Sequence, residues 1–170
     1  EFFNKEKEEM WPHVWQMACR EEEIPEPGDH HVYWIIDRSV IVTRTPSGEI
    51  KGFINSCRHR GRCLRDESGS VDKFRCPFHG ATWDLDGQFK GIPNDWDFEH
   101  IAERDMSLPQ VKVDTWGGFV FINFDLNCAP LEDYMEILPD HFKRFPLEEY
   151  FTGVHVQRVM NCNWKQGENE

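Results

Sequence analysis

The 170-residue sequence contains no apolar run that approaches the roughly 18 residues required for a membrane-spanning helix. It has no basic segment followed by an apolar stretch at its start, so we expect no secretory signal peptide. Basic residues are few, since 19 Lys and Arg stand against 31 Asp and Glu and give a net charge of −12. A nucleic-acid-binding surface must be basic, so the charge argues against a nucleic-acid partner. The chain begins with Glu1 rather than Met, and we expect it to be an excerpt of a longer protein.

Cysteine is also too sparse for a disulfide framework, which is usual in short secreted chains with denser cysteine. Two of the six cysteines stand beside histidines at short spacing, which favours a metal over disulfides and a reducing cytoplasm over export. The other four are predicted to behave as small buried hydrophobes. These four are Cys19, Cys63, Cys128 and Cys162.

Short apolar stretches separated by turn residues make up most of the chain. Apolar residues alternate from Val32 to Ile36, and after a turn near Asp37 and Arg38 further valines follow, which predicts a hairpin. The continuous apolar run Gly118 to Phe124 is typical of a buried strand. Many short strands at this spacing predict a mainly β fold, an antiparallel β-barrel or sandwich.

The two ends of the chain differ from this central region. Phe2 to Met10 predicts a short surface helix, and Trp11 to Cys19 predicts a strand. The apolar spacing from Leu131 to Leu138 predicts one helix that Pro139 ends. Tyr150 to Met160 predicts a new strand outside the first barrel.

Two short segments combine cysteine with histidine, and they are separated by a 16-residue gap. They are Cys57-Arg58-His59 and Cys76-Pro77-Phe78-His79, so each supplies one thiolate and one imidazole. A Cys₂His₂ zinc finger instead groups its cysteines and groups its histidines. In a Rieske centre one iron binds two thiolates and the other binds two imidazoles, which this alternating order supplies. Zinc bound by the same four residues remains an alternative.

Residues around these segments give further hypotheses. Gly61 and Gly80 follow the two histidines, where a tight loop must approach the metal closely. Three arginines crowd the first segment, where they either balance the charge of the cluster, contact an acidic redox partner, or are simply solvated. They are Arg58, Arg60 and Arg62. Trp83 is predicted to pack over the cluster, whereas Trp96 either shields it or forms a subunit contact.

His30 and His31 are adjacent in a predicted strand, so their side chains point to opposite faces. A surface turn is therefore favoured over a metal site for this pair.

Cys57-x-His59-Arg60-Gly61 and Cys76-Pro77-x-His79-Gly80 resemble the two cluster-binding boxes of Rieske proteins. More narrowly, the chain resembles the N-terminal part of the α subunit of Rieske non-heme iron, aromatic-ring-hydroxylating oxygenases. Further matches extend this resemblance over nearly the whole chain. They are Thr82 to Gly87, Trp116 to Asn123, and Asn163 to Lys165 with Glu168 and Asn169.

The resemblance implies a division of the chain into three parts. Residues 1–30 form an N-terminal arm, residues 31–126 the Rieske [2Fe–2S] domain, and residues 127–170 a helical linker entering a truncated α+β catalytic domain. Cys57, His59, Cys76 and His79 are implied as the cluster ligands. The mononuclear Fe(II) is expected only in the missing catalytic domain, because its Asp-x-x-His-x₃₋₄-His pattern is not found. Asp97 and His100 begin such a pattern, but Arg104 and Asp105 stand where its second histidine belongs.

The implied function is one-electron transfer to an oxygenase site beyond this chain, for ring hydroxylation or a related oxidation in aromatic hydrocarbon catabolism. The implied partners are an NAD(P)H-dependent reductase or ferredoxin, within a homotrimer or α/β hetero-oligomer, in the cytoplasm and away from membranes. Phe78, Ala81 and Trp83 replace residues that raise the potential of respiratory Rieske proteins, so we expect about −150 mV. Two alternatives stay open, a stand-alone Rieske ferredoxin and a zinc-stabilised structural module.

Overall fold

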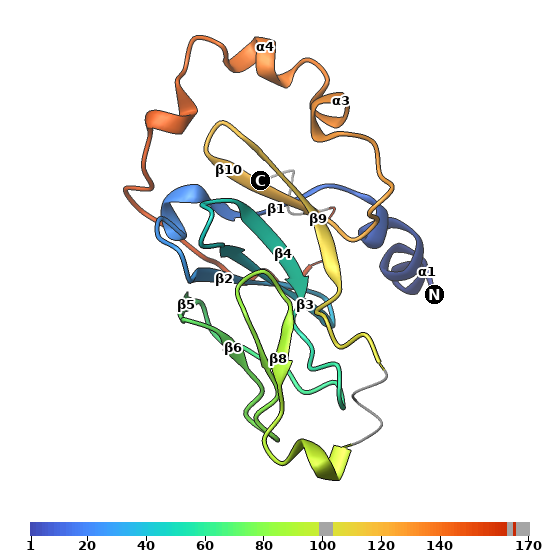
Figure 1. Cartoon of the computed structure of the whole chain (residues 1–170). Helices are drawn as coiled ribbons and strands as arrows, with labels where there is room; N and C mark the ends of the chain where they lie inside the picture. Colours follow the sequence, from blue (N-terminus) through green and yellow to red (C-terminus); the bar gives the residue numbers. More distant parts are fainter. Residues whose placement is uncertain (99–103, 163–164, 166–170) are drawn as a thin grey trace.

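The computed structural model describes residues 1–98, 104–162 and 165, and it contains one large and one small antiparallel sheet (Figure 1). The large sheet has the strand order β1-β10-β9-β4-β3-β2-β5, and the small sheet has the order β6-β7-β8. The strands of the large sheet are β1 (Gln16–Arg20), β2 (Asp29–Ile35), β3 (Arg38–Arg44), β4 (Ile50–Ile54), β5 (Gly69–Ser70), β9 (Gln110–Trp116) and β10 (Phe119–Asn123). Those of the small sheet are β6 (Phe74–Arg75), β7 (Thr82–Trp83) and β8 (Phe89–Gly91). The mainly β, antiparallel fold predicted from the sequence is confirmed.

Tight hairpins set the register of the large sheet. β2 and β3 pair from His30 opposite Thr43 to Ile35 opposite Arg38, as the alternating pattern predicted. β9 and β10 are joined by Gly117 and Gly118, whose φ angles of 58° and 79° suit glycine. The predicted strand over Gly118 to Phe124 is therefore confirmed as β10.

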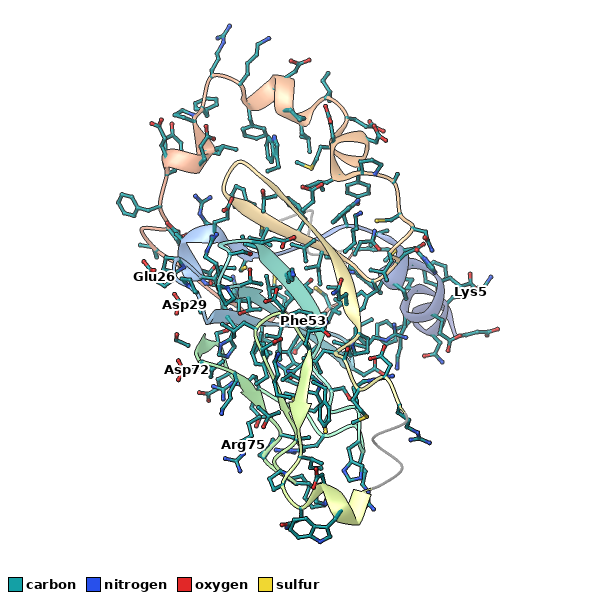
Figure 2. All side chains as sticks on the ribbon, in the orientation of Figure 1. Lys5, Glu26, Asp29, Phe53, Asp72 and Arg75 are labelled. Atoms are coloured by element: carbon teal, nitrogen blue, oxygen red, sulfur yellow. The ribbon has the colours of Figure 1, made fainter. Side chains whose placement is uncertain are left out.

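Strand β3 is covered on both faces and separates two apolar cores. Val40 and Val42 pack into the core of the large sheet, together with Val120 and Ile122. Ile41 points the other way, because successive strand residues alternate between faces. It packs into a second core that lies toward the small sheet and includes Phe53, Phe74, Trp83, Cys57 and Cys76. Figure 2 shows Phe53 in the middle of this region.

The N-terminal segment contributes a strand to the large sheet. It begins with α1 (Phe2–Lys5), the π-helical turn η1 (Glu6–Met10) and the 3₁₀ turn η2 (Trp11–His13). β1 then pairs with β10, from Gln16 opposite Ile122 to Arg20 opposite Phe119. The predicted surface helix is confirmed, and the predicted strand is confirmed only from Gln16 onward, because Trp11–His13 form the turn η2. The proposed division of the chain at residues 30 and 126 stays a prediction.

The segment after β10 differs from its prediction in two places. Two short helices, α3 (Leu131–Met135) and α4 (Leu138–Phe142), replace the single expected helix, because Glu136 interrupts it with a φ of 48°. Pro139 lies in the first turn of α4, where its missing N–H costs nothing. The strand expected over Tyr150 to Met160 is wrong. These residues are exposed and pair with no strand of the described residues. An apolar pattern cannot form a strand without the edge of another strand to pair with.

Helix α3 is attached to the large sheet by Trp15, Leu131 and Met135, which form a third apolar cluster. The short turns η3 (Glu21–Glu23), η4 (Asp95–Phe98) and η5 (Leu147–Glu149) complete the described elements. The small sheet lies at the end of the molecule opposite α3 and α4 (Figure 1). In the described ranges, no helix has both the length and the apolar character needed to cross a bilayer.

Candidate functional site

Two loops with the same hydrogen-bonding frame meet beside the small sheet. We call residues 57–62, which follow β4, loop 1, and residues 76–81, which join β6 to β7, loop 2. In loop 1 the Cys57 N–H donates to the Arg62 carbonyl at 2.8 Å, and the Gly61 N–H donates to the Cys57 carbonyl at 2.8 Å. In loop 2 the corresponding bonds run from Cys76 to Ala81 at 2.8 Å and from Gly80 to Cys76 at 3.0 Å. Each loop therefore turns the chain back within five residues of its cysteine.

The fourth residue after each cysteine is a glycine with a positive φ. Gly61 has φ 73° and Gly80 has φ 77°, in the left-handed region that costs other residues about 1–2 kcal/mol. The histidine occupies the second position after the cysteine in loop 1 and the third position in loop 2. One frame thus presents a thiol and an imidazole from each side.

The two thiols lie inside the protein and face each other. Cys57 and Cys76 are 4% and 2% exposed. Burial raises the pKa of the Cys57 thiol, while the backbone N–H of His59 opposes this rise and the neighbouring Cys76 thiol adds to it. Deprotonated sulfur in this apolar surrounding therefore requires a cation, and an iron centre supplies one.

The two imidazoles lie nearer the surface. The Nδ1 atoms of His59 and His79 are 3.2 Å apart, with ring centroids 4.9 Å apart. Both residues are half-buried. Two nitrogens bound to one tetrahedral metal at about 2.0–2.1 Å are separated by about 3.3 Å, so both Nδ1 atoms are spaced to share one metal.

This donor set fits a two-iron cluster. Among the residues that the structure describes, no three His, Cys, Asp or Glu side chains converge as they would on a single ion. A [2Fe–2S] cluster instead places its thiolates on one iron and its imidazoles on the other, so the two pairs need not share a point. The geometry favours the cluster over a single zinc ion, while the ligand roles of the four residues stay a prediction.

Polar contacts from the large sheet hold the chain just after loop 1. The Asn55 Oδ1 accepts from the N–H groups of Leu64 at 3.1 Å and Arg65 at 3.0 Å, and its Nδ2 donates to the Arg65 carbonyl at 2.6 Å. Asn55 is buried, so one side chain satisfies three backbone groups that water cannot reach readily. Sequence reasoning missed this residue, because its partners are nine and ten positions away.

His30 connects the large sheet to both loop regions, and its predicted place in a surface turn is wrong. It lies in β2 and is 1% exposed. The Arg65 Nε donates to its Nε2 at 3.1 Å, and its ring meets Phe74 edge-on at 5.8 Å. An arginine cannot accept a hydrogen bond, so Nε2 is unprotonated and His30 is neutral. Burial, as the largest cause, lowers its pKa.

Loop 2 is held by the burial of Cys76 and Ala81 in the core and by a hydrogen bond from the Thr82 hydroxyl to the Gly80 carbonyl at 2.9 Å. A Cβ placed on Gly80 would lie 3.0 Å from the Pro93 ring, and the Phe78 ring lies 3.8 Å from that of His79. Trp83 is fully buried in the core that contains both cysteines. Its indole N–H donates to the Met106 carbonyl at 2.6 Å, consistent with the packing role expected from the sequence.

The side chains of the other residues singled out in the sequence do not contact the paired thiols and imidazoles in the described hydrogen bonds. The three arginines of loop 1 are exposed, and Trp96 is 70% exposed. Cys19 is buried, and burial raises its pKa to about 12. Cys63 and Cys128 are half-buried, whereas Cys162 is exposed, so the expectation of burial is wrong for Cys162, which follows the exposed stretch after η5.

Several residues of the sequence-based matches lie outside the described residues. They are His100, Asn163, Trp164, Glu168 and Asn169.

Known proteins resemble this chain in sequence and in structure. The sequence profile of the Rieske [2Fe–2S] domain family matches residues 14–103. The chain is 30% identical over 173 residues to the biphenyl 2,3-dioxygenase subunit alpha of Rhodococcus jostii (strain RHA1), which covers 96% of this chain and 37% of that protein. The chain therefore spans less than two fifths of the length of this curated relative.

Two solved structures share the fold. One is a naphthalene 1,2-dioxygenase variant bound to phenanthrene, with a TM-score of 0.77 and 29% identity over 84% of this chain and 33% of that chain. The other is a quaternary ammonium Rieske monooxygenase in complex with L-carnitine, with a TM-score of 0.77 and 28% identity over 83% of this chain and 40% of that chain. These similarities confirm the resemblance that the two cysteine–histidine boxes predicted.

Proposed function

Because the chain belongs to the Rieske [2Fe–2S] domain family, we propose that it carries one electron at a time to the catalytic iron of an oxygenase. The observation that carries this proposal is the pairing of two buried thiols and two half-buried imidazoles by loops of one frame. Cys57 and Cys76 would hold the inner iron, and His59 and His79 the outer iron. When bound, the cluster supplies one-electron transfer between its oxidised and reduced states.

The chain's own residues give this electron transfer a direction. The thiols face the apolar core, whereas the imidazoles approach the surface, so in the described part of the chain a partner comes closer on the histidine side. The backbone hydrogen bonds of loops 1 and 2 fix the turns that carry the four donors.

The surroundings support a potential near the low end of the Rieske range, about −150 mV. Hydrogen bonds donated to the cluster stabilise its reduced state and raise the potential. Ala81 has no side-chain donor, Phe78 is an exposed hydrocarbon, and the only donor of Trp83 is occupied by the Met106 carbonyl. The side chains at these three positions therefore donate no hydrogen bond to the cluster.

The proposal extends to the whole enzyme. The full protein would be an oxygenase α subunit that receives electrons from an NAD(P)H-dependent reductase or a ferredoxin, within a homotrimer or α/β hetero-oligomer. The relatives whose names include an aromatic substrate favour ring hydroxylation or a related oxidation. Substrate contacts would belong to a catalytic domain outside these residues, as would the mononuclear Fe(II).

The test is the reduced-state EPR spectrum and redox titration of the full-length protein, prepared without air. We expect a rhombic EPR signal of low average g and a reduction potential of about −150 mV. We also expect each α subunit to contain more iron than the two atoms of the cluster. A protein that holds zinc and gives no EPR signal would contradict the proposal. A Rieske signal with only two irons per chain would favour the electron carrier over the oxygenase.

A further inference from the structure

A basic hollow lies on the outer face of the small sheet. It has a volume of about 300 Å³. Its floor is formed by small residues, Thr82 and Gly91, which are directly paired between β7 and β8. The position that a Cβ of Gly91 would take has no neighbouring atom within 4 Å, so the space above it is open.

Three cations surround this floor. Lys73, just before β6, and Arg75 in β6 project to the same side, because Phe74 between them points into the core, and Lys90 projects from β8. Lys90 is paired with Asp84 at 2.6 Å, whereas Lys73 and Arg75 are exposed to solvent. Figure 2 shows the Arg75 side chain directed outward from the small sheet. None of the described residues that line the hollow is acidic.

The part of the chain that holds both loops and the small sheet is less acidic than the rest. Residues 55–98 contain seven Lys and Arg and seven Asp and Glu, so their net charge is zero, and the remaining residues carry the net charge of −12. An acidic protein is therefore repelled less at this end of the molecule than elsewhere.

The hollow adjoins the exposed side of the metal centre. Gly80 lines it and directly follows His79, one of the two half-buried imidazoles. A protein seated in the hollow would therefore lie beside the half-buried imidazoles, the more exposed side of the centre among the described residues.

We propose that this hollow is the docking site for an acidic electron-donor protein, whose carboxylates lie between Lys73 and Arg75. The proposal rests on the proposed electron-transfer function. One electron leaves the reduced [2Fe–2S] centre of the donor, which is oxidised, and reduces the cluster beside His79. Solvated charges of this kind steer a transient encounter and set its rate. A permanent interface with a second copy would be larger and more apolar.

The test measures how fast a reduced, acidic plant-type [2Fe–2S] ferredoxin reduces the full-length protein in a stopped-flow instrument. The wild-type second-order rate constant should fall steeply as salt rises, because screening weakens the attraction. At low ionic strength the double variant Lys73→Glu/Arg75→Glu should react at least tenfold more slowly. The double variant Lys112→Glu/Lys143→Glu has the same charge change on β9 and after α4, and it should stay within twofold of wild type.

Reduced methyl viologen separates docking from damage to the centre. It is a small cation, so it should reduce the Lys73→Glu/Arg75→Glu variant as fast as wild type or faster. A wild-type ferredoxin rate that does not depend on salt, or equal slowing in both double variants, would overturn the proposal. A changed oligomeric state in the Lys73→Glu/Arg75→Glu variant would overturn it in favour of an interface between copies. Absence of a Rieske EPR signal in wild type would instead overturn the proposed function itself.

Discussion

Loop 1 and loop 2 have the same pair of backbone hydrogen bonds and the same left-handed glycine, yet different neighbours hold them in place. The chain after loop 1 is fixed by polar groups, namely Asn55 and the contact between Arg65 and His30. Loop 2 is fixed mainly by packing, with Cys76 and Ala81 buried in the core, and by one hydrogen bond from the Thr82 hydroxyl to the Gly80 carbonyl at 2.9 Å. One frame can therefore be supported by hydrogen bonds on one side of a site and by packing on the other.

This difference predicts unequal responses to substitution. A loop held by packing is sensitive to added volume, because interiors are close-packed. A loop held by hydrogen bonds tolerates volume but is sensitive to the loss of a polar partner. Only the sulfur donors themselves are expected to respond alike in both loops.

The largest effect is expected from the two cysteines, where the loops should be equivalent. Cys57→Ser and Cys76→Ser should each abolish the visible absorption of the cluster and lower the iron content, because a serine hydroxyl is a poor substitute for thiolate. Cys63→Ser is the matched control, since its half-buried sulfur lies outside the facing pair of thiols and donates to the Arg65 carbonyl at 3.2 Å. Normal iron content and an unchanged EPR spectrum in either ligand variant would contradict the assignment.

Substitution of the two glycines should destabilise the protein to different degrees in the two loops. In Gly61→Ala and in Gly80→Ala the new alanine must adopt the left-handed conformation of the glycine. This should lower the free energy of unfolding by about 1–2 kcal/mol in each variant. Gly80→Ala adds a Cβ 3.0 Å from Pro93, whereas the nearest atom at Gly61 is the Ser56 Oγ at 3.8 Å. Overpacking should cost Gly80→Ala about 1–3 kcal/mol more.

The measurement is the thermal midpoint of both variants at one scan rate. Gly80→Ala should melt at the lower temperature by about 2–4 °C for each extra kcal/mol. Adding Pro93→Ala should recover part of that loss in Gly80→Ala but not in Gly61→Ala. Equal midpoints for the two single variants would show that both loops have the same free space.

Loss of a polar partner should affect loop 1 alone. Asn55→Ala leaves the buried Leu64 N–H without its acceptor and should lower the free energy of unfolding by about 1–3 kcal/mol. Amide hydrogen exchange should become faster at residues 61–65 and stay unchanged at residues 76–81. Faster exchange in both loops to the same degree would mean that Asn55 supports the whole site rather than one side.

The smallest effect is expected at His30, which contacts Arg65 after loop 1 and Phe74 before loop 2. Its pKa is lowered in the folded protein, so the unfolded chain binds more protons between that pKa and about 6.5. Stability that is present above pH 6.5 is therefore lost as the pH falls through this window. His30→Gln keeps a polar side chain and should flatten this dependence of the thermal midpoint. An equally steep profile in the variant would assign the dependence to other groups.

The sequence predicted the parts of the molecule that local patterns encode. The β2–β3 hairpin, strand β10 and both cysteine–histidine loops follow from alternation, an apolar run and short spacing. Burial of His30 did not follow from the sequence, because Arg65 and Phe74 reach it from distant positions. The strand expected after residue 150 failed for the same reason, since an apolar pattern does not state which edge it will pair with.

The position of strand β3 between the two cores affects how the molecule unfolds. Its two faces belong to different cores, with Val40 and Val42 on one side and Ile41 on the other. Neither core can open without exposing this strand, so the metal-binding end and the large sheet should form one cooperative unfolding unit. Slowly exchanging amides on both sides of β3 should then share one opening free energy. Release of the metal and collapse of the sheet would be a single event.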